Sequence, residues 1–275
     1  MRRAALHRLA VMVMITSIAL SACGKTIVSQ PIKHPDRWPA VLSDFTFAWS
    51  AESGIDLLAQ PAVSVRAYLE SVVLAWAGGS NDYLYPGFDD AVEREKPSDY
   101  ARYSLTLWPD LAHPWEVPSA GSRRQHILRE ASNGQSVSVV VCLWNWGVAE
   151  KKPDGRYATP GSWRGPLTGI GVERVNVAAP AQMPPPDTRP QKGPSRFPLT
   201  DVFGSWRIIG LLSDAAPSDT LGPGTQWPEY HQDLAACQAL APETVERREF
   251  LTTGEHPRSD FPTLPSEPGW PLETK

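Results

Sequence analysis

Four side chains that could carry acid–base chemistry gather in one acidic stretch: Asp82, Asp89, Asp90 and Glu93. If these carboxylates lined a cavity, they could donate protons to a bound substrate or accept protons from it. A stretch of this kind is more often a solvated acidic face, and we favour that interpretation. The sequence therefore leaves the catalytic residues unknown.

The histidines and the familiar enzyme motifs give no stronger signal. No pair of histidines has the i,i+4 spacing of a zinc helix, and G-x-S-x-G and S-x-x-K are both absent. Gly169-Ile170-Gly171 begins like a dinucleotide loop, but Arg174 replaces the third glycine inside a strand pattern. We interpret His113, which Pro114 and Trp115 follow, as a loop residue. No metal and no cofactor are expected.

The tryptophans offer a binding chemistry. Trp76 lies on a predicted helix, and Trp144, Trp146 and Trp206 lie on predicted strands. Together they could line an apolar pocket for a hydrophobic or sugar-like ligand. Filling of the core is the alternative, and it is the more common role of large aromatic residues. Trp144 and Trp146 are two residues apart and so share one side of a strand, together with Cys142.

The N-terminus carries the most specific pattern in the chain. Arg2, Arg3 and Arg8 precede an apolar run at residues 9–20, which is shorter than the roughly 20 residues of a membrane-spanning helix. The run ends in Leu20-Ser21-Ala22-Cys23. This pattern resembles the lipobox of bacterial lipoproteins, which implies cleavage after residue 22 and lipidation of Cys23. An ordinary secretory leader with an incidental cysteine is the alternative.

Lipidation would place the protein on the extracytoplasmic face of a cell membrane. Each acyl CH2 buried in the bilayer contributes about 0.8 kcal/mol, so two or three chains would anchor the protein stably. In such an oxidising compartment, the two remaining cysteines, Cys142 and Cys237, are predicted to form a disulfide. Two buried free thiols are the alternative.

Composition limits the class of protein. Without the three leader arginines, 23 basic and 30 acidic side chains remain, a net charge of −7 with neutral histidines. There is no stripe of Lys or Arg, so a nucleic-acid partner is not expected. A hydrophobic content of 41% and 11 tryptophans favour a folded body. The 28 prolines, roughly twice the usual ~5%, indicate long irregular loops.

The elements that must position these residues follow from periodicity and turn signals. Pro61 opens a predicted amphipathic helix with Leu69, Val72 and Trp76 at helical spacing, and Gly78-Gly79 ends it. Strands are predicted at residues 136–148, 168–177 and 203–212, the last with Trp206, Ile208 and Leu212 on one face. A second helix is predicted at residues 229–240.

The predicted organisation is a signal peptide at residues 1–22, a lipidated cysteine and spacer at 23–44, one domain at 45–252 and a Pro-rich surface tail at 253–275. A helix followed by long strands indicates an α+β fold. The element order and the Trp-bearing strands resemble the NTF2-like (SnoaL-like) cone. This resemblance implies a curved antiparallel sheet packed against helices, here with long Pro-rich loops.

A second resemblance lies in FTFAW at residues 45–49, GIDL at 54–57 and YPGF at 85–88. These stretches are similar to uncharacterised actinobacterial lipoproteins, which supports the localisation and implies no activity.

We therefore expect a membrane-anchored envelope lipoprotein that binds a partner protein or a small apolar ligand and is not an enzyme. One alternative is an NTF2-like isomerase or hydrolase that uses a carboxylate inside the cone. Another alternative is an accessory subunit of an envelope transport or conjugation apparatus.

The lipobox makes a direct prediction for the substitution Cys23→Ala. Without the thiol that receives lipid, the precursor should stay uncleaved by the lipoprotein peptidase and should not incorporate labelled palmitate. Metabolic labelling followed by electrophoresis of the membrane fraction measures both effects. Lipid labelling that is unchanged in the variant would eliminate the anchor.

Overall fold

The computed structural model describes residues 37–94, 107–160, 165, 167–182, 190–213 and 227–272. All of them fall within one unit that spans residues 36–275. The leader, Cys23 and most of the predicted spacer lie outside the described residues. None of the helices in the described ranges combines the length and the apolar character needed to cross a membrane.

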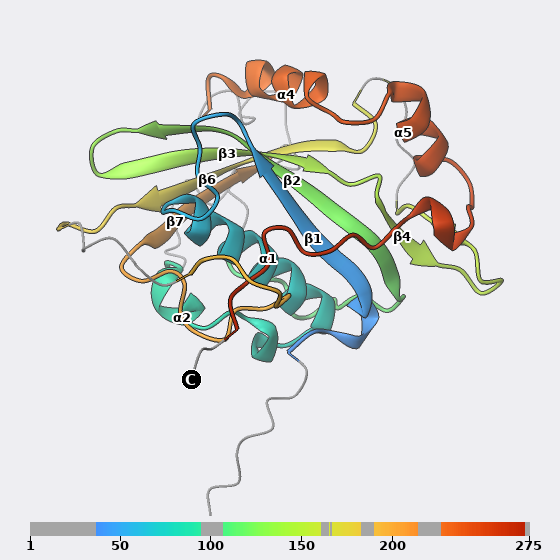
Figure 1. Cartoon of the computed structure of the whole chain (residues 1–275), viewed down its shortest axis with the longest axis horizontal. Helices are drawn as coiled ribbons and strands as arrows, with labels where there is room; N and C mark the ends of the chain where they lie inside the picture. Colours follow the sequence, from blue (N-terminus) through green and yellow to red (C-terminus); the bar gives the residue numbers. More distant parts are fainter. Residues whose placement is uncertain are drawn as a thin grey trace, which may run out of the picture. The chain divides into compact units, whose positions relative to one another are not determined.

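A strongly curled sheet with helices on both faces forms the body (Figure 1). The fold is α+β, as the sequence predicts, and the curled sheet is consistent with a cone. Its strands are β1 (Asp44–Ala51), β2 (Ser119–Ser132), β3 (Ser136–Trp144), β4 (Val148–Lys151), β5 (Tyr157–Ala158), β6 (Ile170–Ala178) and β7 (Arg207–Ser213).

Strand β2 organises the sheet because three strands pair with it. β3 and then β4 pair antiparallel with successive parts of one edge, while β1 pairs parallel with the other edge. β6 and β7 continue the antiparallel sheet beyond β3. The parallel β1–β2 pair is the one departure from the expected antiparallel sheet among the described strands.

Gly121 of β2 allows the backbone of the turn between β3 and β4 to approach β2 closely. Its φ is +112°, and a Cβ there would lie 2.0 Å from the carbonyl oxygen of Gly147. The N–H of Ser122 donates to that same oxygen at 3.0 Å. A side chain at position 121 would therefore force the two strands apart.

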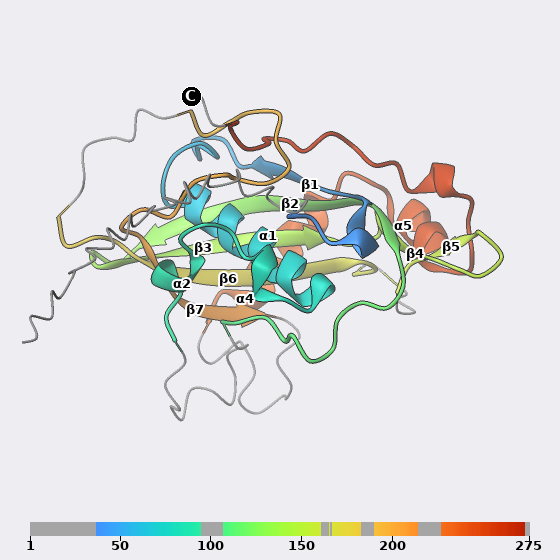
Figure 2. The ribbon, with the colours of Figure 1, turned by 90° about the horizontal axis from the view of Figure 1, so that it is seen from below.

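Helices lie on both faces of the sheet (Figures 1 and 2), and each face carries its own apolar layer. In β3, Val139, Val141 and Leu143 belong to the layer under α1 (Ala62–Gly78). The alternate residues Cys142 and Trp144 belong to the layer under α4 (Tyr230–Ala239) and α5 (Val245–Thr252). β3 is thus a central strand with two apolar faces, which confirms the prediction as far as Trp144. The predicted extension to residue 148 is wrong, because a turn that contains Trp146 separates β3 from β4.

Helix α1 begins directly after Pro61 and ends at Gly79, whose φ of 63° gives the left-handed C-terminal cap. Both ends agree with the prediction. The expected amphipathic character is wrong, because 14 of the 17 residues are buried. Short elements and loops pack around the helix, including η1 (Ala40–Leu42), η2 (Asn81–Tyr83) and α2 (Phe88–Ala91).

The predicted common face of Trp206, Ile208 and Leu212 holds for the first two residues and is wrong for Leu212. Ile208 and Leu211 lie in the layer under α1, whereas Leu212 lies in the layer under α4. The pairing register of β7 with β6 shifts so that Ile209 is skipped. This bulge inverts the alternation of side chains between the two ends of the strand.

Both ends of the described body are more tightly packed than expected. Trp38 and Leu42, from the predicted spacer, are buried. The C-terminal segment, which includes η4 (Arg258–Asp260), is not a surface tail, because Phe261 and Trp270 are buried. Trp270 also exchanges two backbone hydrogen bonds with Ser195. These two bonds pair the backbone of Trp270 in a segment whose prolines have no N–H to donate.

One buried carboxylate joins four segments of the chain. Glu70 of α1 accepts hydrogen bonds of 2.7 Å from the indoles of Trp49 and Trp270 and from the hydroxyl of Tyr85. Burial raises the pKa of Glu70, although the neighbouring guanidinium of Arg66 and the three donors favour its charged form. The carboxylate therefore depends on this set of donors.

Arg66 stands one helical turn before Glu70 and binds the same C-terminal segment. Its guanidinium donates to the carbonyl of Leu57 at 2.9 Å and to that of Pro268 at 2.8 Å. The Cζ atom lies 4.4 Å from the ring centroid of Trp270. Arg66, over the ring, and Glu70, at the indole N–H, thus both hold Trp270 and the C-terminal segment against α1.

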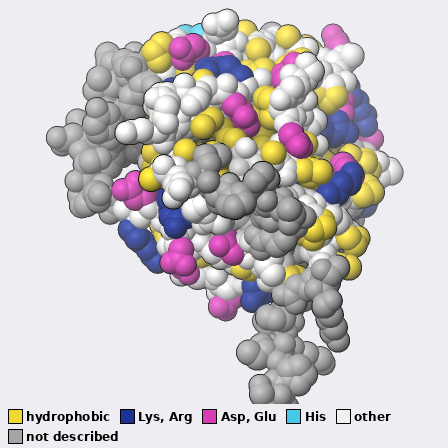
Figure 3. Space-filling model, turned by 60° about the vertical axis from the view of Figure 1, so that its left-hand side comes forward, with side chains coloured by type: hydrophobic (Ala, Val, Ile, Leu, Met, Phe, Trp, Pro, Cys, Tyr) yellow, Lys and Arg dark blue, Asp and Glu magenta, His cyan; other side chains and the backbone are white. Residues whose placement is uncertain are grey.

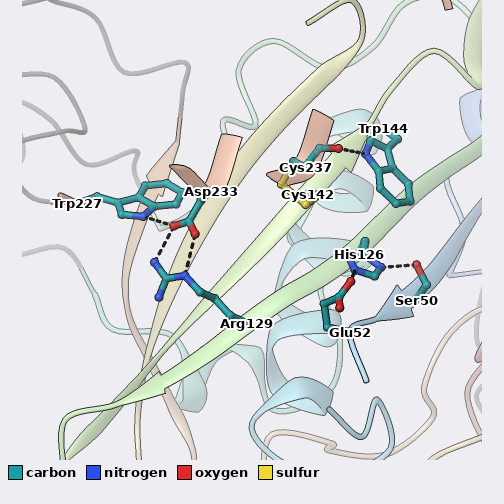
Figure 4. Close-up of a disulfide and its surroundings, with 9 residues drawn as sticks. All are labelled: Ser50, Glu52, His126, Arg129, Cys142, Trp144, Trp227, Asp233 and Cys237. Atoms are coloured by element: carbon teal, nitrogen blue, oxygen red, sulfur yellow. Dashed lines mark hydrogen bonds and ion pairs between the residues drawn. A yellow bond between two sulfur atoms is a disulfide. The ribbon is translucent and has the colours of Figure 1, made fainter. Parts of the chain in front are cut away.

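A disulfide between Cys142 of β3 and Cys237 of α4 joins the sheet to the helices on its other face (Figure 4). The prediction of this pair is confirmed. The indole of Trp144 also donates to the carbonyl of Cys237 at 3.3 Å. The disulfide closes a loop with a sequence separation of 95 residues.

Removal of the disulfide should therefore cost considerable stability. For a loop of this length, the chain-entropy model gives about 4–5 kcal/mol at 25 °C. We expect Cys142→Ala/Cys237→Ala, or reduction of the wild type, to lower the free energy of unfolding by about 4 kcal/mol. Denaturant titration with and without reductant measures the loss. The double variant is the control, because its stability should not respond to reductant.

Glu70→Gln should destabilise the protein by about 3 kcal/mol, the cost of breaking a buried charged network. The amide keeps the shape of the side chain, but its NH2 group must face at least one of three donors. Denaturant unfolding measures the change. Glu116→Gln, at an exposed position, should change stability by less than about 0.5 kcal/mol. Equal effects of the two substitutions would contradict a central role for Glu70.

Candidate functional site

A pocket of about 230 Å³ opens between α1 and the sheet. One stripe of α1 forms its largest wall, and the segment at residues 108–110 forms a second wall. Three strands close it with one residue each: Arg123 from β2, Glu173 from β6 and Leu211 from β7. The helical wall consists of Tyr68, Leu69, Val72, Val73 and Trp76.

The helical wall follows from spacing alone. Positions 69, 72, 73 and 76 recur at intervals of three and four, which places them along one side of a helix. This is the stripe that the sequence predicts as apolar. On a helix that is otherwise enclosed, the stripe meets the pocket where α1 passes over the curled sheet (Figure 2).

Aromatic side chains form the rim of the pocket. Trp76 is 40% exposed, and its indole donates to the carbonyl of His113 at 2.9 Å. Its ring meets that of Trp115 edge to face, with centroids 5.6 Å apart. Trp108 packs edge to face on Phe88, with centroids 5.0 Å apart. These contacts hold the indoles in place, so the rim is formed before any ligand arrives.

Three charged side chains line this mainly apolar pocket: the exposed Asp110, and Arg123 and Glu173 from the sheet. Arg123 shares the α1-facing side of β2 with Gln125 and Ile127. Glu173 lies opposite Val141, which also faces α1. Burial lowers the pKa of Arg123, and the nearby carboxylate of Glu173 opposes that shift. An arginine and a glutamate therefore face the same small apolar space.

Unused hydrogen-bonding capacity lies on the same side of β2. Among the described residues, the buried Nε of Arg123 has no hydrogen-bond partner. Neither the amide oxygen nor the amide nitrogen of Gln125 has one there, although this residue is only 1% exposed. Buried polar atoms without partners are rare in native proteins. Their presence beside a pocket indicates a site that is suited to a polar ligand group.

The four predicted ligand-binding tryptophans do not share this pocket. Trp76 lies at its rim, and Trp206 is buried in the layer under α1. Trp144 and Trp146 lie on the opposite face of the sheet, where the indole of Trp146 donates to Glu243 at 2.9 Å. A single pocket lined by all four is therefore a wrong prediction. Strand alternation turns Trp144 away from α1, and Trp146, in the turn after β3, packs in the same layer as Trp144.

The acidic stretch belongs to the surface, as favoured from the sequence. Asp82, Asp89, Asp90 and Glu93 are all exposed, and Asp89 pairs with Arg94 at 3.1 Å. His113 is an exposed loop residue that contacts Asp110 at 2.7 Å. This contact and the N–H of Ala112 lower the pKa of Asp110.

Sequence reasoning missed Arg123, Gln125 and Glu173. None belongs to a motif, and the strand β2 was not predicted. The available signal was the S-R-R-Q-H-I-L-R order of residues 122–129, in which Arg123, Gln125 and Ile127 occupy alternate positions. Comparison with protein-family models, curated proteins and solved structures finds no match for this chain. The site therefore has to be interpreted from its own chemistry.

Proposed function

We propose that this protein is a lipid-anchored envelope protein that binds a small apolar molecule with an acidic group in the pocket between α1 and the sheet. The observation that carries the proposal is the guanidinium of Arg123 within mainly apolar walls. A partly desolvated arginine attracts an anion more strongly than one in water. Leu69, Val72 and Trp76 would contact the apolar part of the same ligand.

The anchor in this proposal is the lipidated Cys23, on the extracytoplasmic face of a cell membrane. The lipobox pattern supports it, and so does the disulfide, since such bonds persist in exported proteins. A tethered binding protein keeps its ligand near the membrane. This role needs no catalytic group, in agreement with the expectation of a non-enzymatic module.

The second candidate function is an enzyme of the isomerase or hydrolase class. Glu173 favours it, because a carboxylate in an apolar pocket is a common arrangement for general acid–base catalysis. Glu70 is a poorer candidate, although it faces Tyr85, because three donors occupy its oxygens and it does not line the pocket.

Docking to a protein partner has weaker support. The exposed large hydrophobic side chains come from separate elements, including Ile209 of β7, Leu240 after α4 and Phe250 of α5. On the face shown in Figure 3, hydrophobic, acidic and basic side chains are intermixed. An accessory subunit would be expected to present a larger continuous apolar patch.

The ligand proposal predicts a preference for charge that depends on Arg123. Octanoate should bind the full-length protein in detergent about 10- to 100-fold more tightly than octanol, the range expected for a charge-assisted hydrogen bond. Arg123→Met should remove this preference while octanol binding changes little. Quenching of tryptophan fluorescence reports binding, because Trp76 and Trp108 line the pocket.

Arg207→Met is the matched control, since Arg207 is exposed on β7 and outside the pocket. Its octanoate preference should equal that of the wild type. Leu69→Trp, which fills the pocket, should weaken both ligands. Equal affinity of the wild type for octanoate and octanol would refute the anionic part of the proposal. Native mass spectrometry of protein from its own host would then show whether any small molecule copurifies.

A further inference from the structure

A serine, a histidine and a glutamate meet where β1 pairs with β2, on the face opposite the pocket (Figure 4). Ser50 and His126 are direct partners in the parallel register. The hydroxyl of Ser50 lies 2.8 Å from Nδ1 of His126, and Oε1 of Glu52 lies 3.2 Å from Nε2 of the same ring. None of the three was a candidate from the sequence.

The contacts assign the protons of this group. An ionised carboxylate only accepts hydrogen bonds, so the contact with Glu52 requires the proton on Nε2 of His126. In the neutral ring, Nδ1 is then an acceptor, and the hydroxyl of Ser50 must donate to it. This is the order of a hydroxyl, a base and an orienting carboxylate that activates a serine nucleophile.

The surroundings hold the imidazole in this orientation. His126 is only 7% exposed, and its ring stacks on Trp144 with centroids 5.5 Å apart and an interplanar angle of 21°. Trp144 is itself fixed by its hydrogen bond to the carbonyl of Cys237, next to the disulfide. The base is therefore positioned by buried, cross-linked structure before a substrate arrives.

The other two members of the group, in contrast, reach the surface. Ser50 is exposed near the end of β1, and the Glu52 side chain is 43% exposed. The N–H of Trp49 donates away from β2, to Glu267, whereas the N–H of Glu52 donates to Ile127 in β2. By alternation, the N–H of Ala51 also points away from β2 and provides a donor next to Ser50.

We propose that Ser50 is a nucleophile that cleaves small, activated esters at the surface of the protein. Its Oγ forms a bond to the acyl carbon while the bond to the leaving alkoxide breaks. His126 takes the hydroxyl proton on Nδ1 and passes it to the alkoxide. Water then attacks the acyl-serine, gives a proton to Nδ1, and releases the acid as Oγ regains its proton. Glu52 is a positioning residue.

Labelling with a fluorophosphonate probe tests the nucleophile, because the probe forms a stable bond only with activated serines. The full-length protein in detergent should label once, and peptide mass spectrometry should place the label on Ser50. Ser50→Ala should abolish the labelling. The matched control is Ser136→Ala, in β3, whose hydroxyl contacts Asn133 and no histidine. It should label as the wild type does.

Hydrolysis of p-nitrophenyl acetate tests the other two roles. His126→Gln should lower kcat by about 100-fold or more, as expected for loss of a general base. Glu52→Gln should lower kcat by about 10-fold or more with KM unchanged, which a merely structural role would not produce. Melting temperatures identify a variant that fails to fold. If His126→Gln fails to fold, loss of hydrolysis in Ser50→Ala still tests the proposal, because Ser50 is exposed and its substitution should leave the fold intact.

Three outcomes would overturn the proposal. They are a wild type that does not label, a label at a residue other than Ser50, and ester hydrolysis that is equal in the wild type and Ser50→Ala. These tests do not depend on the pocket, since none of the three side chains lines it. Failure of octanoate binding would leave them unaffected.

Discussion

The buried carboxylate of Glu70 is the constraint on which the arrangement of the body depends. An ionised group in the interior is costly unless donors surround it, and here the donors come from β1, the turn before α2 and the C-terminal segment. Trp49 and Tyr85 flank α1, at 21 and 15 residues from Glu70, whereas Trp270 lies 200 residues away, so the network can form only when all four segments are in place. The network therefore specifies one packing of the chain around α1.

This packing also explains why the pocket lies where it does. The C-terminal segment and the short elements enclose most of α1. The stripe of α1 residues that ends at Trp76 faces the pocket instead. An apolar residue at position 123 or 173 could fill the space beneath the helix. Arg123 and Glu173 instead place charged groups there. If the space were filled around them, both groups would lose solvation energy, which the described contacts of Arg123 do not restore.

The sequence predicts well the features that depend on local periodicity. The spacing of Leu69, Val72 and Trp76 identifies α1, and the apolar run of β3 identifies a central strand. Features that depend on distant pairing are hidden. β2 carries polar residues on both faces. On one face, Arg124 donates to Glu243 and Arg129 donates to Asp233. On the other face, Arg123 lines the pocket. No local pattern reveals such partners, nor the bulge in β7.

Strand β2 links the two candidate sites while keeping them chemically separate. Arg123 and Gln125 project toward α1, whereas Arg124 and His126 project toward α4, since alternate residues face opposite sides of a strand. Each site is supported by its own layer: the pocket by the stripe of α1, and His126 by Trp144 beside the disulfide. Side chains without shared partners act nearly independently, so one rigid strand can position two distinct chemistries.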